Sequence, residues 1–120
     1  MEITKTSLLG VPFLQVVGDI DHFSSLALDD AFQDALSSGA SHILLDLTEC
    51  PYLDSGGLGV ILTVLRKVRA KGWLGCVGCS TDLLRLFTIA GLTADREFRI
   101  FASLAEASAA LEGRIIWPDQ

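Results

Sequence analysis

The stretch Tyr52-Leu53-Asp54-Ser55-Gly56-Gly57-Leu58-Gly59 lies between two apolar segments and decides how the chain on either side of it folds. Residues 43–47 before it are nearly all apolar, which is typical of a central strand covered on both faces. Residues 58–65 after it are also apolar and continue into a basic segment that ends near Lys71. Basic side chains suit the C-terminal half of a helix. We therefore interpret the octet as a turn from a buried strand into a helix.

Ser55 lies at the expected start of this helix. A serine there is a good N-cap, because its hydroxyl accepts a hydrogen bond from one of the first free amide groups. Those N–H groups and the positive end of the helix dipole also favour a phosphate on a hydroxyl at that place. The glycines of the octet let the backbone turn sharply and let a bulky group come close. Position alone leaves two roles open for Ser55, a helix cap or a phosphate acceptor.

Turn signals and apolar periodicity along the rest of the chain predict the order β-β-α-β-α-β-α-β-α. An initial hairpin followed by alternating strands and helices indicates an α/β fold, with a mostly parallel sheet and one antiparallel edge strand. The expected strands are 2–8, Val11–Val17, 43–47, Trp73–Val77 and Phe98–Phe101. The expected helices are about 25–38, 55–71, 80–91 and 103–112. Further N-caps are expected at Ser24 or Ser25, Ser80 and Ser103.

Three segments carry a resemblance to a known family. Asp54-Ser55-Gly56-Gly57-Leu58-Gly59 resembles the D-S-[S/T/A/G]-G-L-G loop of the STAS domain of anti-sigma factor antagonists. Gly18-Asp19-Ile20-Asp21-His22-Phe23-Ser24 resembles the segment G-[E/D]-[L/I]-D-x-x-[T/S] of that family, and Leu84-Arg85-Leu86-Phe87-Thr88-Ile89-Ala90-Gly91-Leu92 resembles its helix ending in x-G-L. The similarity covers roughly residues 2–112. We expect one STAS-like domain over residues 1–113 and a C-terminal tail at 114–120.

This resemblance implies a binding protein that is switched by phosphorylation. Ser55 falls on the position that is phosphorylated in anti-sigma factor antagonists, and Gly56 removes the second hydroxyl found there in some members. The implied partners are an anti-sigma factor of the serine kinase type, which binds when Ser55 is free and phosphorylates it, and a phosphoserine phosphatase. ATP and magnesium would belong to the kinase, so we expect no cofactor or metal in this chain. The expected partner-binding residues are Asp19, Asp21, His22, Asp54, Ser55, Gly56, Gly57 and Leu58.

Three other functions compete with this one. An enzyme with Ser55 as nucleophile would need a base within reach, and only His22 and His42 could serve; the hydrolase motif G-x-S-x-G is absent because Leu53 stands two residues before the serine. A nucleotide sensor would need the P-loop lysine or the dinucleotide spacing that the glycine turn lacks. A STAS subunit of a larger signalling or transport assembly, in which the serine is not used, is compatible with the sequence.

Composition narrows the class of partner and the expected location. Half of the 120 residues are apolar, which is enough for one domain with a core. The net charge is −6 without a basic block, so we expect neither nucleic acid nor an anionic membrane as partner. No apolar stretch approaches the ~18 residues of a membrane span, and no signal peptide is apparent at the N-terminus. We therefore expect a cytoplasmic protein.

Two features lie outside the functional prediction. Cys50, Cys76 and Cys79 are an odd number of cysteines and predict no disulfide framework. Cys76-Val77-Gly78-Cys79 has the spacing of a redox motif, but Cys76 falls within an apolar strand, so we expect a buried small residue and a loop thiol, with redox or metal chemistry as the alternative. The apolar tail Arg114-Ile115-Ile116-Trp117-Pro118 either covers the domain or makes a homodimer contact.

Overall fold

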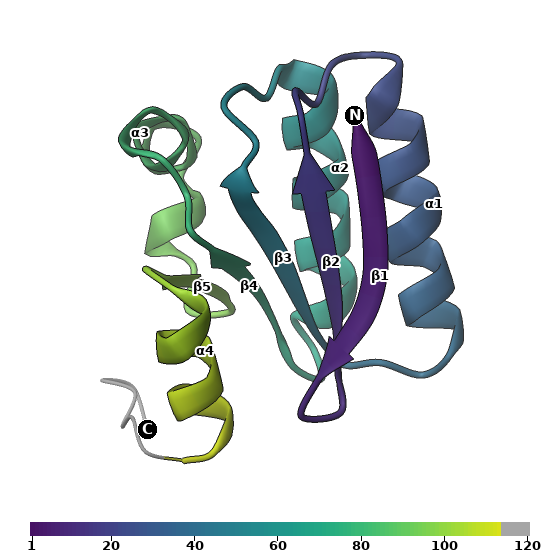
Figure 1. Cartoon of the computed structure of the whole chain (residues 1–120), viewed down its shortest axis with the longest axis vertical. Helices are drawn as coiled ribbons and strands as arrows, with labels where there is room; N and C mark the ends of the chain where they lie inside the picture. Colours follow the sequence, from purple (N-terminus) through teal and green to yellow (C-terminus); the bar gives the residue numbers. More distant parts are fainter. Residues whose placement is uncertain (114–120) are drawn as a thin grey trace.

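A computed structural model describes residues 1–113 and shows one five-stranded sheet with helices on both faces (Figure 1). The elements are β1 (Glu2–Leu8), β2 (Val11–Val17), α1 (Ser24–Ser37), β3 (His42–Glu49), α2 (Ser55–Val68), β4 (Trp73–Val77), α3 (Thr81–Ile89), the short 3-10 helix η1 (Leu92–Ala94), β5 (Phe98–Phe101) and α4 (Leu104–Leu111). The predicted α/β class and the predicted order of elements are confirmed.

The sheet runs in the order β1-β2-β3-β4-β5. β1 pairs with β2 in antiparallel fashion, and every following pair is parallel, as predicted. Pro12 lies beside the turn of the first hairpin, and the pairing of β2 with β3 begins only at Phe13. The missing N–H of Pro12 therefore falls at a strand end.

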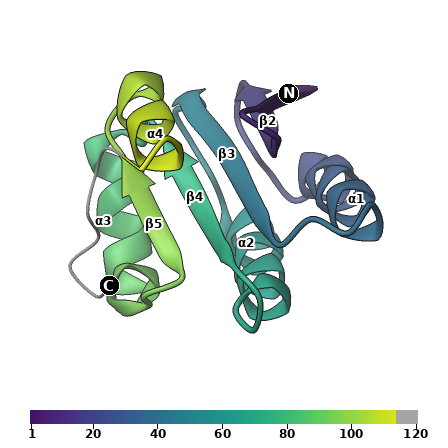
Figure 2. The ribbon, with the colours of Figure 1, turned by 90° about the horizontal axis from the view of Figure 1, so that it is seen from below.

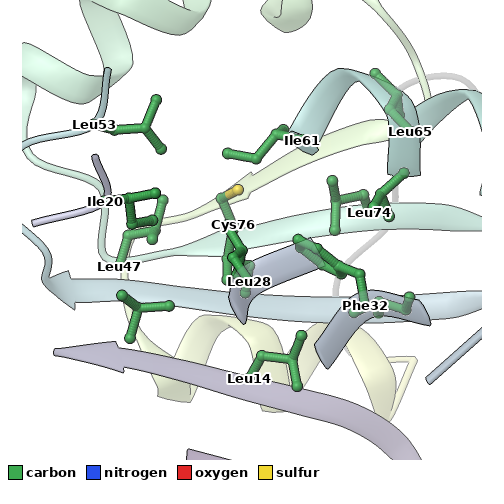
Figure 3. Close-up of a cluster of buried hydrophobic side chains, with 14 of the residues drawn as sticks. Leu14, Ile20, Leu28, Phe32, Leu47, Leu53, Ile61, Leu65, Leu74 and Cys76 are labelled. Atoms are coloured by element: carbon green, nitrogen blue, oxygen red, sulfur yellow. The ribbon is translucent and has the colours of Figure 1, made fainter. Parts of the chain in front are cut away.

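Side chains of the central strand alternate between two apolar layers. Ile43, Leu45 and Leu47 of β3 belong to the large cluster that α1, α2 and α3 cover, whereas Leu44 belongs to a smaller cluster that α4 covers on the opposite face. Successive side chains of a strand point to opposite faces of the sheet, which produces this alternation and explains why β3 is apolar on both sides. Figure 2 shows α4 on the opposite face of the sheet from α1 and α2, and Figure 3 shows residues of α1 and α2 packed over the strands.

Two of the predicted helices have different ends in the structure. α1 begins at Ser24, but neither Ser24 nor Ser25 caps it: Phe23 is the N-cap residue and makes no side-chain cap bond. α2 ends at Val68 instead of about Lys71. Gly72, which follows this end, packs against the residue before β3: a Cβ on Gly72 would lie 2.0 Å from the Ser41 carbonyl oxygen. The predicted caps Ser80 and Ser103 are confirmed: Ser80 Oγ accepts from the Leu83 N–H and Ser103 Oγ from the Glu106 N–H.

The C-terminal tail at 114–120 lies outside the described residues, so its expected role as a cover or a dimer contact stays a prediction. Within residues 1–113, no helix is both long enough and apolar enough to cross a membrane.

Candidate functional site

Two loops meet where β2 and β3 end. Gly18 donates its N–H to the Glu49 carbonyl at 2.9 Å, and the Ile20 N–H donates to the Tyr52 carbonyl at 2.9 Å. The Asp54 N–H then returns a hydrogen bond to the Ile20 carbonyl at 3.0 Å. These bonds extend the parallel pairing beyond the strands, with Ile20 opposite Leu53. The loop before α1 and the loop before α2 therefore form one surface at the carboxyl edge of the sheet, where open α/β sheets meet their ligands.

Asp54, and not Ser55, is the N-cap of α2, so the predicted capping role of Ser55 is wrong. Asp54 has extended backbone angles, and its carboxylate accepts hydrogen bonds from the N–H groups of Gly56 at 2.9 Å and Gly57 at 3.2 Å. Ser55 is consequently the first helical residue. Its side chain is exposed, and its hydroxyl has no hydrogen-bond partner among residues 1–113.

Asp21 orders the neighbouring loop. Its Oδ1 accepts from the N–H groups of Phe23 at 3.0 Å and Ser24 at 2.8 Å, and from the Ser24 hydroxyl at 3.0 Å. The hydrogen bonds from the backbone and the side chain of Ser24 favour the charged carboxylate and lower the pKa of Asp21 from its usual value. Asp21 therefore contributes to the site a negative charge and a loop that is held in a fixed shape.

The glycines at the start of α2 allow this helix to lie close to the other loop. A Cβ on Gly57 would lie 2.6 Å from Cγ2 of Ile20 and 3.0 Å from Cγ of Leu53. A Cβ on Gly56 would lie 3.3 Å from the His22 Cα. Bulkier residues would push the two loops apart, so these glycines set the distance between Ser55 and the Asp21 loop.

The predicted partner-binding residues gather in this region but differ in exposure. Those that are exposed are Asp19, Asp21, His22 and Ser55; those that are half-buried are Asp54, Gly56 and Leu58; and Gly57 is buried. Leu58 packs against the large apolar cluster. Gly57 and Leu58 therefore shape the surface from below, whereas the other residues have atoms at the surface.

Sequence reasoning missed two exposed apolar side chains beside these residues. Phe23 is 81% exposed and Leu26 is 69% exposed, although both are large and apolar. The ring of His22 lies edge-on to that of Phe23, with 5.5 Å between the ring centroids. For Leu26 a signal was available, because this residue falls outside the stripe of α1 that contains Leu28 and Phe32. Apolar side chains that the fold leaves in water beside a polar loop are typical of interaction surfaces.

Neither of the histidines considered as a base for Ser55 makes a hydrogen bond with it among the described residues. His42 begins β3 at the far end of the sheet and stacks on Trp73, with ring centroids 4.9 Å apart. Burial lowers the pKa of His42. Residues 1–113 contain no group of three or more His, Cys, Asp or Glu that could hold a metal ion.

Comparison with known proteins agrees with this fold. The STAS domain family matches residues 2–107, and the chain belongs to that family. It is 27% identical to the anti-sigma-F factor antagonist RsfB of Mycobacterium tuberculosis over 92% of this chain and 89% of the relative. It is 34% identical to the anti-sigma-B factor antagonist of Listeria monocytogenes over 65% of this chain and 69% of the relative. The structure of the Bacillus cell fate determinant SpoIIAA in its phosphorylated form matches with a TM-score of 0.73 and 18% identity, covering 92% of this chain and 99% of that one.

Proposed function

We propose that this protein is an anti-sigma factor antagonist whose binding is switched off by phosphorylation of Ser55. The observation that carries the proposal is the placement of Ser55 beside the Asp21 loop: its hydroxyl is exposed at the first position of α2 and makes no hydrogen bond with any of the residues 1–113. Relatives named anti-sigma factor antagonists support the role. The partner would be an anti-sigma factor of the serine kinase type, which releases its sigma factor when it binds this chain.

The unphosphorylated surface would bind through its apolar side chains. Phe23 and Leu26 expose apolar area that a partner can cover, and buried aromatic side chains commonly dominate binding energy at interfaces. Asp19 and Asp21 lie at the same loop and would meet basic groups of the partner. The partner surface that fits is therefore an apolar depression with basic residues near it.

A phosphate on Ser55 would change binding more than it changes folding. Phosphorylation adds a charge of about −1.5 to −2 and considerable bulk. Within the chain, the positive end of the α2 dipole favours that charge by roughly 0.3–1 kcal/mol, which offsets part of the repulsion from Asp54. At the interface nothing in this chain offsets the bulk, and a loss of about 3–4 kcal/mol would weaken binding several-hundred-fold. We therefore expect a folded protein that has lost its partner.

The kinase and the phosphatase would both act on the same exposed hydroxyl. Ser55 stands at the edge of the molecule, so an enzyme can reach it without unfolding α2. The kinase would be the anti-sigma factor itself, using its own ATP and magnesium, and a phosphoserine phosphatase would restore the free hydroxyl. Because transcription takes place in the cytoplasm, the proposal puts the protein there.

Capture of partners by three forms of the protein tests the proposal. Wild type, Ser55→Ala and Ser55→Asp are immobilised, and proteins retained from a lysate of the source organism, with ATP or with ADP, are identified by mass spectrometry. Thr81→Asp is the matched control, because Thr81 is also an exposed first residue of a helix, α3. With ADP, we expect wild type, Ser55→Ala and Thr81→Asp to retain a kinase-type anti-sigma factor and Ser55→Asp to lose it. With ATP, only Ser55→Ala should retain it, because the partner would phosphorylate Ser55 of wild type and of Thr81→Asp.

Two results would contradict the proposal. If all four forms retain the same proteins, charge at Ser55 does not control binding, and a STAS subunit of a larger assembly becomes the better description. If the anti-sigma factor binds but ATP leaves no phosphate on Ser55 in the purified pair, the switch is wrong while the partner is right. Phe23→Ala tests the binding surface separately from the phosphorylation switch. We expect this variant to bind the anti-sigma factor about tenfold more weakly, or weaker still, while the phosphorylation state of Ser55 is unchanged.

A further inference from the structure

Three thiols gather near the carboxyl ends of β3 and β4. Cys50 follows β3 and Cys76 lies within β4, and both are buried in the large apolar cluster. Cys79 follows β4, is half-buried, and packs against the same cluster. Figure 3 shows Cys76 on the side of the sheet that Ile61 of α2 covers. All three cysteines are free thiols.

The bend at Gly78 brings Cys79 to the same side of the sheet as Cys76. In a regular strand, residues three apart point to opposite faces. β4 follows this rule up to its last residue, because Cys76 belongs to the large cluster and Val77 to the small one. Gly78 then has φ +71°, which is unfavourable for other residues, and the chain bends there. A Cβ on Gly78 would also lie 2.1 Å from Thr48 Oγ1, so the bend is closely packed on β3.

We propose that Cys76 and Cys79 are an oxidation site that forms a reversible disulfide, in which Cys79 reacts first with a peroxide. The Cys79 thiolate attacks one peroxide oxygen, the O–O bond breaks, and hydroxide leaves and is protonated to water. Cys79 is thereby oxidised by two electrons to the sulfenic acid. The Cys76 sulfur then attacks the Cys79 sulfur, the S–O bond breaks, and the departing hydroxide takes the Cys76 proton and leaves as a second water.

The surroundings of the three thiols give them different reactivity. Interaction with the Cys76 thiol lowers the pKa of Cys79, and the same interaction together with burial raises the pKa of Cys76. Cys50 donates to the Tyr52 carbonyl at 3.3 Å, and burial raises its pKa. The thiolate is the reactive form of cysteine, and Cys79 is also the most accessible of the three. Cys79 is therefore the entry point for an oxidant, and Cys76 is the resolving thiol.

Such a disulfide would fix the connection between β4 and α3. Cys79 immediately precedes Ser80, the N-cap of α3, and the bend at Gly78 rests on Thr48 of β3. In a reducing compartment, a disulfide of this kind is transient and responds to oxidants. This inference does not depend on the proposed role of Ser55.

Thiol trapping with mass spectrometry tests the site. The reduced protein is treated with hydrogen peroxide, the remaining thiols are alkylated after unfolding, and the peptides are identified. The same treatment is applied to three variants whose folding circular dichroism has confirmed: Cys50→Ser, Cys76→Ala and Cys79→Ala. We expect wild type and Cys50→Ser to form a disulfide within the peptide that contains both Cys76 and Cys79, reversible with dithiothreitol. Cys76→Ala should instead accumulate a sulfenic acid on Cys79 that dimedone traps.

Other outcomes would overturn the inference. An oxidised wild-type protein in which Cys76 is still alkylated excludes Cys76 as the resolving thiol, and a disulfide that includes Cys50 places the chemistry elsewhere. Alkylation of the native, reduced protein gives a second measurement that needs no variant. Faster labelling of Cys50 than of Cys79 would contradict the assignment of Cys79 as the reactive thiol.

Discussion

Two glycines two residues apart in α2 should respond to the same substitution with opposite signs. Both are helical, and alanine is favoured over glycine by about 1 kcal/mol within a helix. A Cβ on Gly59 meets no atom within 4 Å, so Gly59→Ala gains this preference. A Cβ on Gly57 lies 2.6 Å from Cγ2 of Ile20 and 3.0 Å from Cγ of Leu53, and both side chains are buried.

The clash at Gly57 outweighs the helix preference. Overpacking a closed core costs about 1–3 kcal/mol, because neighbouring side chains leave their rotamers or the backbone shifts. Subtracting the helix term of about 1 kcal/mol, Gly57→Ala should lower the free energy of unfolding by up to about 2 kcal/mol, whereas Gly59→Ala should raise it by up to ~1 kcal/mol. The helix term is common to both variants, so they differ by the overpacking cost of about 1–3 kcal/mol. At about 4 °C per kcal/mol for a domain of this size, their Tm values should differ by roughly 4–12 °C.

Urea unfolding followed by circular dichroism measures both changes on one scale, and the slope of the free energy with urea shows whether unfolding stays two-state. The reasoning would be refuted if Gly57→Ala were as stable as Gly59→Ala. The two loops would then accommodate a methyl group at Gly57 in spite of the short distances to Ile20 and Leu53. Equal destabilisation by both substitutions would refute it as well, since it would indicate that α2 responds to alanine in general and not to the contact at Gly57.

Two further predictions concern the carboxylates of the site. Asp54→Ala removes the N-cap of α2 and should lower the free energy of unfolding by about 1 kcal/mol in thermal or urea unfolding, while Asp54→Asn keeps an acceptor and should cost less; equal losses would contradict the capping role. Asp21 has a depressed pKa in the folded state, so its contribution to stability is present above its ordinary value of 3.8 and is lost as the pH falls through the lower folded value. An NMR titration should find the pKa of Asp21 below 3.8 and raised in Ser24→Ala; no change in Ser24→Ala would exclude the hydroxyl as a cause.

The sequence predicted the order of the elements and the sheet because its apolar pattern is strong. The run 43–47 is apolar at every position but Asp46, and Gly39 ends α1 with φ +93°, so both signals are local and unambiguous. The capping residue of α2 was harder, because Asp54 and Ser55 are both good N-caps and only the backbone angles decide between them. The exposure of Phe23 was also beyond local rules, since burial depends on which elements lie above a residue, and no described element covers this one.

The difference at the cap bears directly on the proposed switch. If Ser55 were the N-cap, its hydroxyl would be tied to the backbone of α2, and a phosphate there would compete with the bonds that start the helix. Asp54 takes that role instead, accepting the N–H groups of Gly56 and Gly57. Among residues 1–113 the Ser55 hydroxyl makes no hydrogen bond, so the proposed kinase would modify it while the cap, the helix and the neighbouring Asp21 loop keep their shape. Because Asp54 caps the helix and Ser55 would carry the phosphate, phosphorylation would change binding without changing the fold.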